Sequence, residues 1–121
     1  MSIYAAAVVR YFEAWNATDA DALAKAVAAA WAEDGTYTDP LADVRGHEEI
    51  AAVIRAAHEQ FPGFEFRLTG EADGNHHIAR FGWELVSTDG SAPVAGSDVI
   101  TLAEDGRITS VLGFLDRLPE A

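Results

Sequence analysis

The order of local patterns along this chain predicts an α+β domain, with three helices followed by a sheet. Apolar residues recur every three or four positions in the first half, whereas from Phe64 onward they alternate with polar ones. The chain has 121 residues, of which half are hydrophobic, enough to bury a core. We therefore expect residues 1–121 to form a single domain, with the helices packed on a curved antiparallel sheet around an apolar pocket.

The first two helices are indicated by apolar spacing and by capping residues. One apolar face runs from Tyr4 to Trp15, with Ser2 as the expected N-cap. After a break at residues 16–19, Thr18 is the expected cap of a second helix, rich in alanine and carrying Trp31 near its end.

A short strand is expected at residues 36–38, and a loop is expected from Pro40 to Gly46. The third helix has Glu48 and Glu49 in its first turn, where the helix dipole favours acidic side chains. Pro62 and Gly63 are expected to end it.

The remaining strands are predicted by alternation and by turn residues. Turns are expected at residues 73–75, 88–91 and 105–106, which leaves strands at 94–102 and 108–115. A shift of one residue in strand pairing would turn all the apolar side chains of a strand toward solvent. We therefore expect the alternating apolar side chains of these strands to face the helices. They are Phe64, Phe66, Phe81, Trp83 and Leu85.

Composition argues against several classes of function. The formal net charge of −12 argues against binding nucleic acid or an anionic membrane surface. The chain has no Cys, and no Gly-rich loop precedes a helix in a phosphate-binding pattern. The first 15 residues lack a basic start and are interpreted as a helix rather than a signal peptide, so a cytoplasmic location is expected.

Four segments resemble the nuclear transport factor 2-like superfamily, in its SnoaL-like and ketosteroid isomerase-like branches. The likeness runs from about Val8 to Asp116, and the segments occur in order at nearly the family's spacing. They are residues 10–16 (RYFEAWN), 31–40 (WAEDGTYTDP), 46–50 (GHEEI) and 98–108, which includes DVI and DGRI. The resemblance implies the cone-shaped fold of this superfamily. That fold hosts isomerases, cyclases, hydrolases, dehydratases and binding modules, so the resemblance implies the fold more strongly than one activity.

The resemblance implies roles for three residues. Tyr11 occupies the position of an oxyanion-hole tyrosine, Asp39 that of a general base, and Asp98 that of a protonated aspartic acid in the oxyanion hole. Trp31 and Ile54 stand where isomerases carry further tyrosines of the hydrogen-bond network, and Leu115 replaces a pocket tryptophan. The residues expected to bind substrate are Trp15, Trp31, Ile54, Phe64, Phe66, Phe81, Trp83, Val111, Leu115 and Asp116.

Each candidate also has a purely structural interpretation. Tyr11 lies on an apolar helical stripe and suits a core tyrosine, and Asp39 before Pro40 suits a residue that closes a turn. Asp98 shares its strand face with apolar neighbours, where a carboxyl must be hydrogen-bonded, paired or protonated. Asp116 suits a strand-end charge. The adjacent His76 and His77 point to opposite faces of a strand, so no metal site is expected.

Three functions remain open. The first is a cofactor-free isomerase or cyclase, in which Asp39 removes a proton beside the carbonyl of a small apolar ligand while Tyr11 and neutral Asp98 stabilise the enolate. The second is a binding or accessory domain without catalysis. The third is epoxide hydrolysis, with Asp98 and Asp116 activating water. The resemblance also implies a homodimer through the outer sheet face, which should include Val99, Thr101, Thr109 and the neighbours of Val111.

Overall fold

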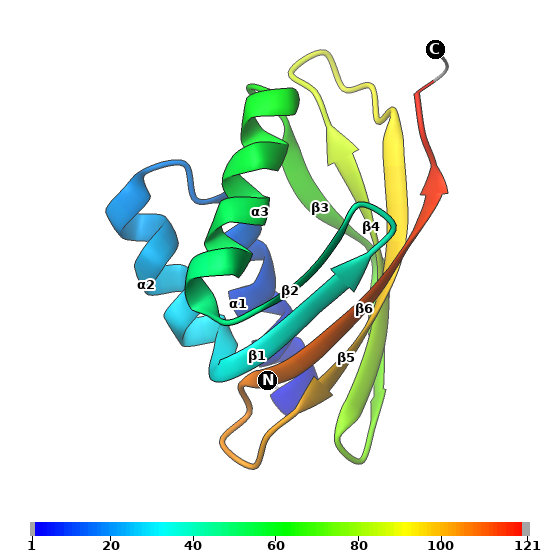
Figure 1. The fold of residues 1–121 in the computed structure, drawn as a ribbon. Coiled ribbons are helices and arrows are strands. Elements are labelled where there is room, and N and C mark those ends of the chain that lie inside the picture. The colour runs from blue at the N-terminus through cyan, green and yellow to red at the C-terminus, as the bar shows by residue number, and fades with distance from the viewer. Residues whose placement is uncertain (1, 120–121) are drawn as a thin grey trace.

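Three helices lie on one face of a curved six-stranded sheet in the computed structural model, which describes residues 2–119 (Figure 1). The helices are α1 (Ile3–Asn16), α2 (Ala20–Ala30) and α3 (His47–Gln60). The strands are β1 (Trp31–Asp39), β2 (Ala42–Arg45), β3 (Glu65–Asn75), β4 (Ile78–Val86), β5 (Val94–Leu102) and β6 (Ile108–Arg117). The expected α+β order is confirmed.

The sheet is open and mixed, with the strand order β2-β1-β6-β5-β4-β3. The expected antiparallel pairing holds for β3–β4, β4–β5 and β5–β6. The expectation is wrong for β1 and β6, which run parallel. A parallel pair needs a long crossover connection, and here the chain passes through β2, α3 and three further strands before β6 returns to β1.

The helix ends differ from expectation at one cap and one boundary. Ser2 caps α1 by accepting from the Ala5 amide, as expected. The cap of α2 is Asp19, which accepts from the Ala22 amide, rather than Thr18. Trp31 begins β1 instead of ending the helix, because its backbone is already extended, with φ −107° and ψ 145°.

Two expected connections are placed differently in the structure. The loop expected from Pro40 to Gly46 contains β2, which pairs with β1 in a hairpin. The turn expected at residues 73–75 lies at His76 and His77, because Asn75 still pairs with Ile78. His76 has a φ of 45°, the left-handed conformation that such a tight loop requires. The 105–106 turn lies where expected, between β5 and β6.

The alternation in β4 and β5 orients one face of the sheet toward the helices. Phe81, Trp83 and Leu85 are all buried, as expected, and Phe66 lies partly buried against the core. The fully buried large side chains come from both layers. They are Trp31, Ile50, Ile54, Ile100, Ile108, Val27 and Val111.

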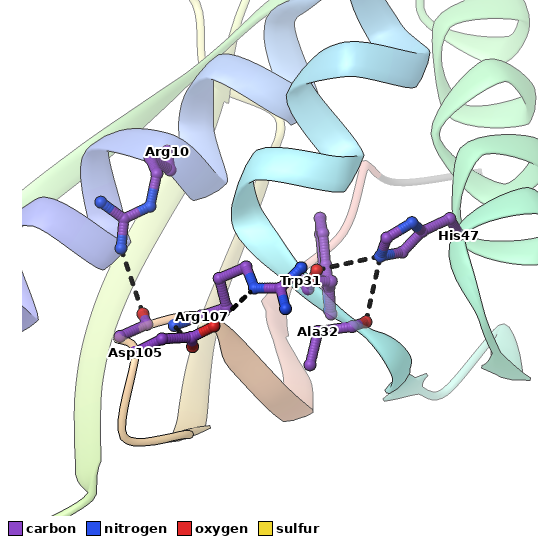
Figure 2. Close-up of polar contacts among 7 residues, drawn as sticks. Arg10, Trp31, Ala32, His47, Asp105 and Arg107 are labelled. Carbon is purple, nitrogen blue, oxygen red and sulfur yellow. Dashed lines mark hydrogen bonds and ion pairs between the residues drawn. The ribbon is translucent and has the colours of Figure 1, made fainter.

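Side chain-to-backbone hydrogen bonds fasten the helices to the end of the sheet that carries the β5–β6 hairpin (Figure 2). Arg10 of α1 donates to the Gly106 carbonyl at 3.1 Å. His47 Nε2 of α3 donates to the Trp31 and Ala32 carbonyls at 2.9 and 3.0 Å. At the other end of α3, His58 Nε2 donates to the Trp15 carbonyl at 2.6 Å. These bonds connect α1 and α3 to the sheet and to each other.

Candidate functional site

A cavity of about 420 Å³ lies between α1, α3 and the concave face of the sheet. Aromatic and aliphatic side chains form most of its wall. The polar side chains among its lining residues are Tyr11, Tyr37, Asp39 and Gln60. None of the lining residues is Lys, Arg or His. The cavity is therefore an apolar space with a few polar groups, one of them a carboxyl group.

Two carboxyl groups lie on either side of Gly113, which belongs to β6. Asp98 comes from β5 and Asp39 from β1, the two strands that pair with β6. Asp98 of β5 pairs with Gly113 of β6, and Thr38, which precedes Asp39 on β1, pairs with Leu112. A Cβ atom added at Gly113 would lie 2.6 Å from Asp98 Oδ1 and 3.4 Å from the Asp39 Cβ. The missing side chain of Gly113 therefore provides the space that the Asp98 carboxyl occupies, and Asp39 lies just across it.

Asp98 is held in the interior by Tyr11. The Tyr11 hydroxyl donates to Asp98 Oδ2 at 2.7 Å, and the two residues are 2% and 3% exposed. Tyr11 lines the cavity, whereas Asp98 does not. A molecule in the cavity would thus contact the tyrosine, and would sense the carboxyl group through it.

Burial raises the pKa of Asp98 to about 6, although hydrogen bonds from Tyr11 and the Trp83 indole act in the opposite direction. The charges of Asp39 and Asp116 raise it further. Burial, followed by the charge of Asp98, raises the pKa of Tyr11 well above its usual value of 10, so Tyr11 stays a phenol. Asp98 is the group of this pair whose proton comes and goes near neutral pH.

Asp39 closes a turn and lines the cavity at the same time. Its Oδ1 accepts from the Leu41 and Ala42 amides, both at 2.8 Å, as an Asp does in a turn before a hairpin. Its Oδ2 accepts from the Tyr37 hydroxyl at 2.6 Å. The structural and the functional interpretation of Asp39 are therefore compatible in one conformation.

The other sequence-predicted residues divide between the cavity wall and the core. Trp15, Phe66, Trp83 and Leu115 line the cavity. Trp31, Ile54 and Val111 are fully buried in the core, and Phe64 and Phe81 also pack outside the cavity lining. Asp116 is exposed near the end of β6.

Sequence reasoning missed Tyr37, Gln60 and the residues at the cavity mouth. Tyr37 lies two positions before Asp39 on the same strand, so it shares a face with it, and this spacing could have indicated the contact. Leu41, 79% exposed, lies in the β1–β2 hairpin, and Leu118 follows β6. Both line the cavity, but neither has a local sequence signal that distinguishes it from other surface residues.

No cluster of three or more His, Asp and Glu side chains within residues 2–119 is arranged to hold a metal ion. The helices in the same part of the chain lack the combination of length and hydrophobicity that a membrane span requires.

Arg117, the arginine nearest in sequence to Asp116, donates to Glu84 at 2.7 Å and to the Ala92 carbonyl.

The chain belongs to the SnoaL-like family, whose domain model matches residues 8–111. A protein of that family from Agrobacterium tumefaciens strain C58, named as a candidate isomerase, is 42% identical, with a TM-score of 0.90. The alignment covers 96% of this chain and 99% of that one. The resemblance seen in the sequence is thus confirmed at the level of the family.

More distant structures share the fold. A candidate SnoaL-like polyketide cyclase from Jannaschia sp. CCS1 is 20% identical, with a TM-score of 0.75 and coverage of 94% of this chain and 85% of that one. A candidate polyketide cyclase from Sinorhizobium meliloti is 22% identical, with a TM-score of 0.66 and coverage of 92% and 94%. No curated protein matches the chain.

Proposed function

We propose that this protein binds a small, uncharged, apolar carbonyl compound in its cavity and removes a proton from the carbon beside the carbonyl. The observation that carries the proposal is that a carboxyl group and a phenol, Asp39 and Tyr11, line one largely apolar cavity from different secondary-structure elements. A base and a hydrogen-bond donor facing the same apolar space are the two groups that enolisation needs.

Asp39 acts as the base in this reaction. The C–H bond beside the carbonyl breaks, its proton passes to a carboxylate oxygen of Asp39, and its electron pair moves onto the carbonyl oxygen. Tyr11 donates to that oxygen as its negative charge develops. Removing one preorganised donor of this kind typically costs about 3 kcal/mol of transition-state stabilisation.

The proton on Asp98 decides whether Tyr11 can donate into the cavity. With Asp98 ionised, the Tyr11 proton is directed to Asp98 Oδ2. When Asp98 takes up a proton, it can donate to the Tyr11 oxygen, which turns the phenol proton toward a ligand. With a pKa of about 6, Asp98 can take up and release a proton near neutral pH. A negative charge that develops on the ligand favours the protonated form of Asp98.

The relatives support the proposal at the level of reaction class. The names of the Agrobacterium protein and of the two polyketide cyclases refer to isomerisation and cyclisation. Enolisation of a carbonyl compound is a first step common to both kinds of reaction. The family membership of this chain and the groups that line its cavity therefore favour the same first step here.

Proton exchange in D₂O tests the proposal without knowledge of the natural substrate. A panel of small uncharged ketones and β-diketones is incubated with the protein, and loss of the α-proton signal is followed by NMR. Trp15 and Trp83 line the cavity, so quenching of tryptophan fluorescence reports binding. We expect exchange by the wild type, at least a 100-fold slower exchange by Asp39→Asn, and similar binding by both.

Asp73→Asn is the matched control, because Asp73 is exposed on β3 and paired with Arg80. It should exchange at the wild-type rate. Binding of the panel without exchange by the wild type would contradict catalysis and favour the alternative of a ligand-binding domain. Equal exchange by wild type and Asp39→Asn would remove Asp39 from its assigned role.

We also propose that two copies associate through the outer face of the sheet. Leu112 and Phe114 of β6 are exposed there, at 46% and 62%, beside the partly buried Val99 of β5. Two neighbouring large apolar side chains on a sheet face suit a two-fold contact. Light scattering at micromolar concentration should give a dimer mass, and Phe114→Glu should give a monomer. A monomeric wild type would contradict the proposal.

A further inference from the structure

The carboxylate of Asp39 has almost all of its hydrogen-bonding capacity already in use. A carboxylate has about four lone-pair positions, two on each oxygen. The Leu41 and Ala42 amides occupy the two positions on Oδ1, and the Tyr37 hydroxyl occupies one on Oδ2. One position on Oδ2 therefore remains for a proton taken from a ligand.

Tyr37 is built to remain a donor. It is 4% exposed, and its ring packs against Trp15 with centroids 5.4 Å apart. Burial, followed by its hydrogen bond to Asp39, raises the pKa of Tyr37 well above the usual 10. The Tyr37 phenol thus keeps its proton across the physiological pH range. Tyr37 lies two residues before Asp39 on β1, so the two side chains share one face of the strand and the hydroxyl points toward Asp39.

We infer that Tyr37 is a positioning residue for the proposed reaction, which orients the Asp39 carboxylate so that the free lone pair of Oδ2 is the proton acceptor. This inference rests on the proposed function for its purpose, but its structural basis is independent of any ligand. Tyr37 does not receive the proton. It holds Oδ2 in place.

The two tyrosines of the cavity therefore have different roles. Tyr11 faces the oxygen of the ligand, whereas Tyr37 faces the base. Replacing Tyr37 by Phe removes one charge-assisted hydrogen bond from the carboxylate while keeping the ring that packs on Trp15. The carboxylate of the variant should be less well oriented.

Carbon-13 NMR of protein labelled at the Asp carboxyl carbons tests this without substrate. The Asp39 signal, assigned with Asp39→Asn, is compared at pH 7 in the wild type, in Tyr37→Phe and in Tyr4→Phe. Tyr4 donates its hydroxyl to the His76 carbonyl, so Tyr4→Phe loses a phenol hydroxyl elsewhere and is the matched control. We expect the chemical shift of the Asp39 carboxyl carbon to change in Tyr37→Phe alone, because only that variant loses a hydrogen bond to this carboxylate.

A second variant gives the opposite shift. Difluorotyrosine placed at position 37 is a stronger donor than tyrosine, so the Asp39 carboxyl signal should move in the direction opposite to that in Tyr37→Phe. It preserves the hydrogen bond and the shape of the side chain, and so remains informative if Tyr37→Phe folds poorly. An unchanged Asp39 signal in both variants would overturn the inference. Because no ligand is present, these shifts are decided separately from proton exchange, whose absence in the wild type would instead contradict the proposed function.

Discussion

The molecule contains two tyrosine–aspartate pairs that are chemically alike and differently placed. The Tyr11–Asp98 bond measures 2.7 Å and the Tyr37–Asp39 bond 2.6 Å. The first joins α1 to β5 in the interior, across 87 positions of sequence. The second lies within β1, where Asp39 is half-buried and also receives two backbone amides.

The comparison shows that the surroundings of the two aspartates, rather than their residue type, give them different roles. Around Asp98 the loss of water dominates, and it outweighs the donors that favour the charged form. Around Asp39 three donors converge on a carboxylate beside the cavity. Asp98 therefore exchanges its proton near pH 6, whereas the Asp39 carboxyl group is held by its three donors at the cavity wall.

Replacing Asp98 by Asn should give the largest change in stability. Asp98 has a folded pKa of about 6 against an ordinary 3.8, roughly two units at about 1.4 kcal/mol each. A raised folded pKa adds stability below about pH 4, and this contribution is lost as pH rises through 6. Asp98→Asn removes the buried charge. It should therefore be about 1–3 kcal/mol more stable than the wild type at pH 8, with little difference near pH 4.

Urea denaturation at several pH values measures this change. The difference between variant and wild type is informative because it cancels the pH dependence caused by the other acidic residues. A difference that stays constant from pH 4 to pH 8 would show that Asp98 does not titrate in this window.

Replacing Gly113 by Ala should disturb the Tyr11–Asp98 pair through sterics. The added Cβ would lie 2.6 Å from Asp98 Oδ1 and 3.4 Å from the Thr38 carbonyl, so the buried carboxyl group must move. We expect a loss of about 1–3 kcal/mol in the free energy of unfolding. Gly82→Ala is the control, because its Cβ would meet the exposed hydroxyl of Thr69, which can rotate away. Equal losses in the two variants would contradict a specific role for the space at Gly113.

Replacing Asp39 by Asn should act in the opposite direction from Asp98→Asn, and by less. An Asn side chain offers one oxygen where Asp39 offers two, so either Tyr37 or the turn amides lose their acceptor. We expect a destabilisation of about 1 kcal/mol at pH 7, measured by the same denaturation experiment. A stabilised variant would mean that the three donors do not support the carboxylate.

Local patterns predicted those parts of the fold and site that depend on periodicity. Strand parity placed Asp98 among buried apolar residues, and helical spacing placed Tyr11 on the inner face of α1. The parallel pairing of β1 and β6 has no local signal, since it joins segments far apart in the chain. Ile54 and Val111 were expected to bind substrate but lie in the core, because a sequence pattern does not distinguish the core from the cavity wall. The dual bonding of Asp39 likewise depends on the β1–β2 hairpin, and four residues are too few for alternation to reveal β2.

The pH titration of the Asp98 carboxyl carbon tests most directly whether Asp98, in the buried Tyr11–Asp98 pair, binds a proton near neutral pH. In protein labelled with carbon-13 at the Asp carboxyl groups, the Asp98 signal should titrate with a pKa of about 6. Tyr11→Phe should raise this pKa, because the Tyr11 hydroxyl stabilises the charged form, whereas the Tyr4→Phe control should leave it unchanged. An Asp98 pKa near the ordinary 3.8, unaffected by Tyr11→Phe, would contradict the division of work between the two pairs.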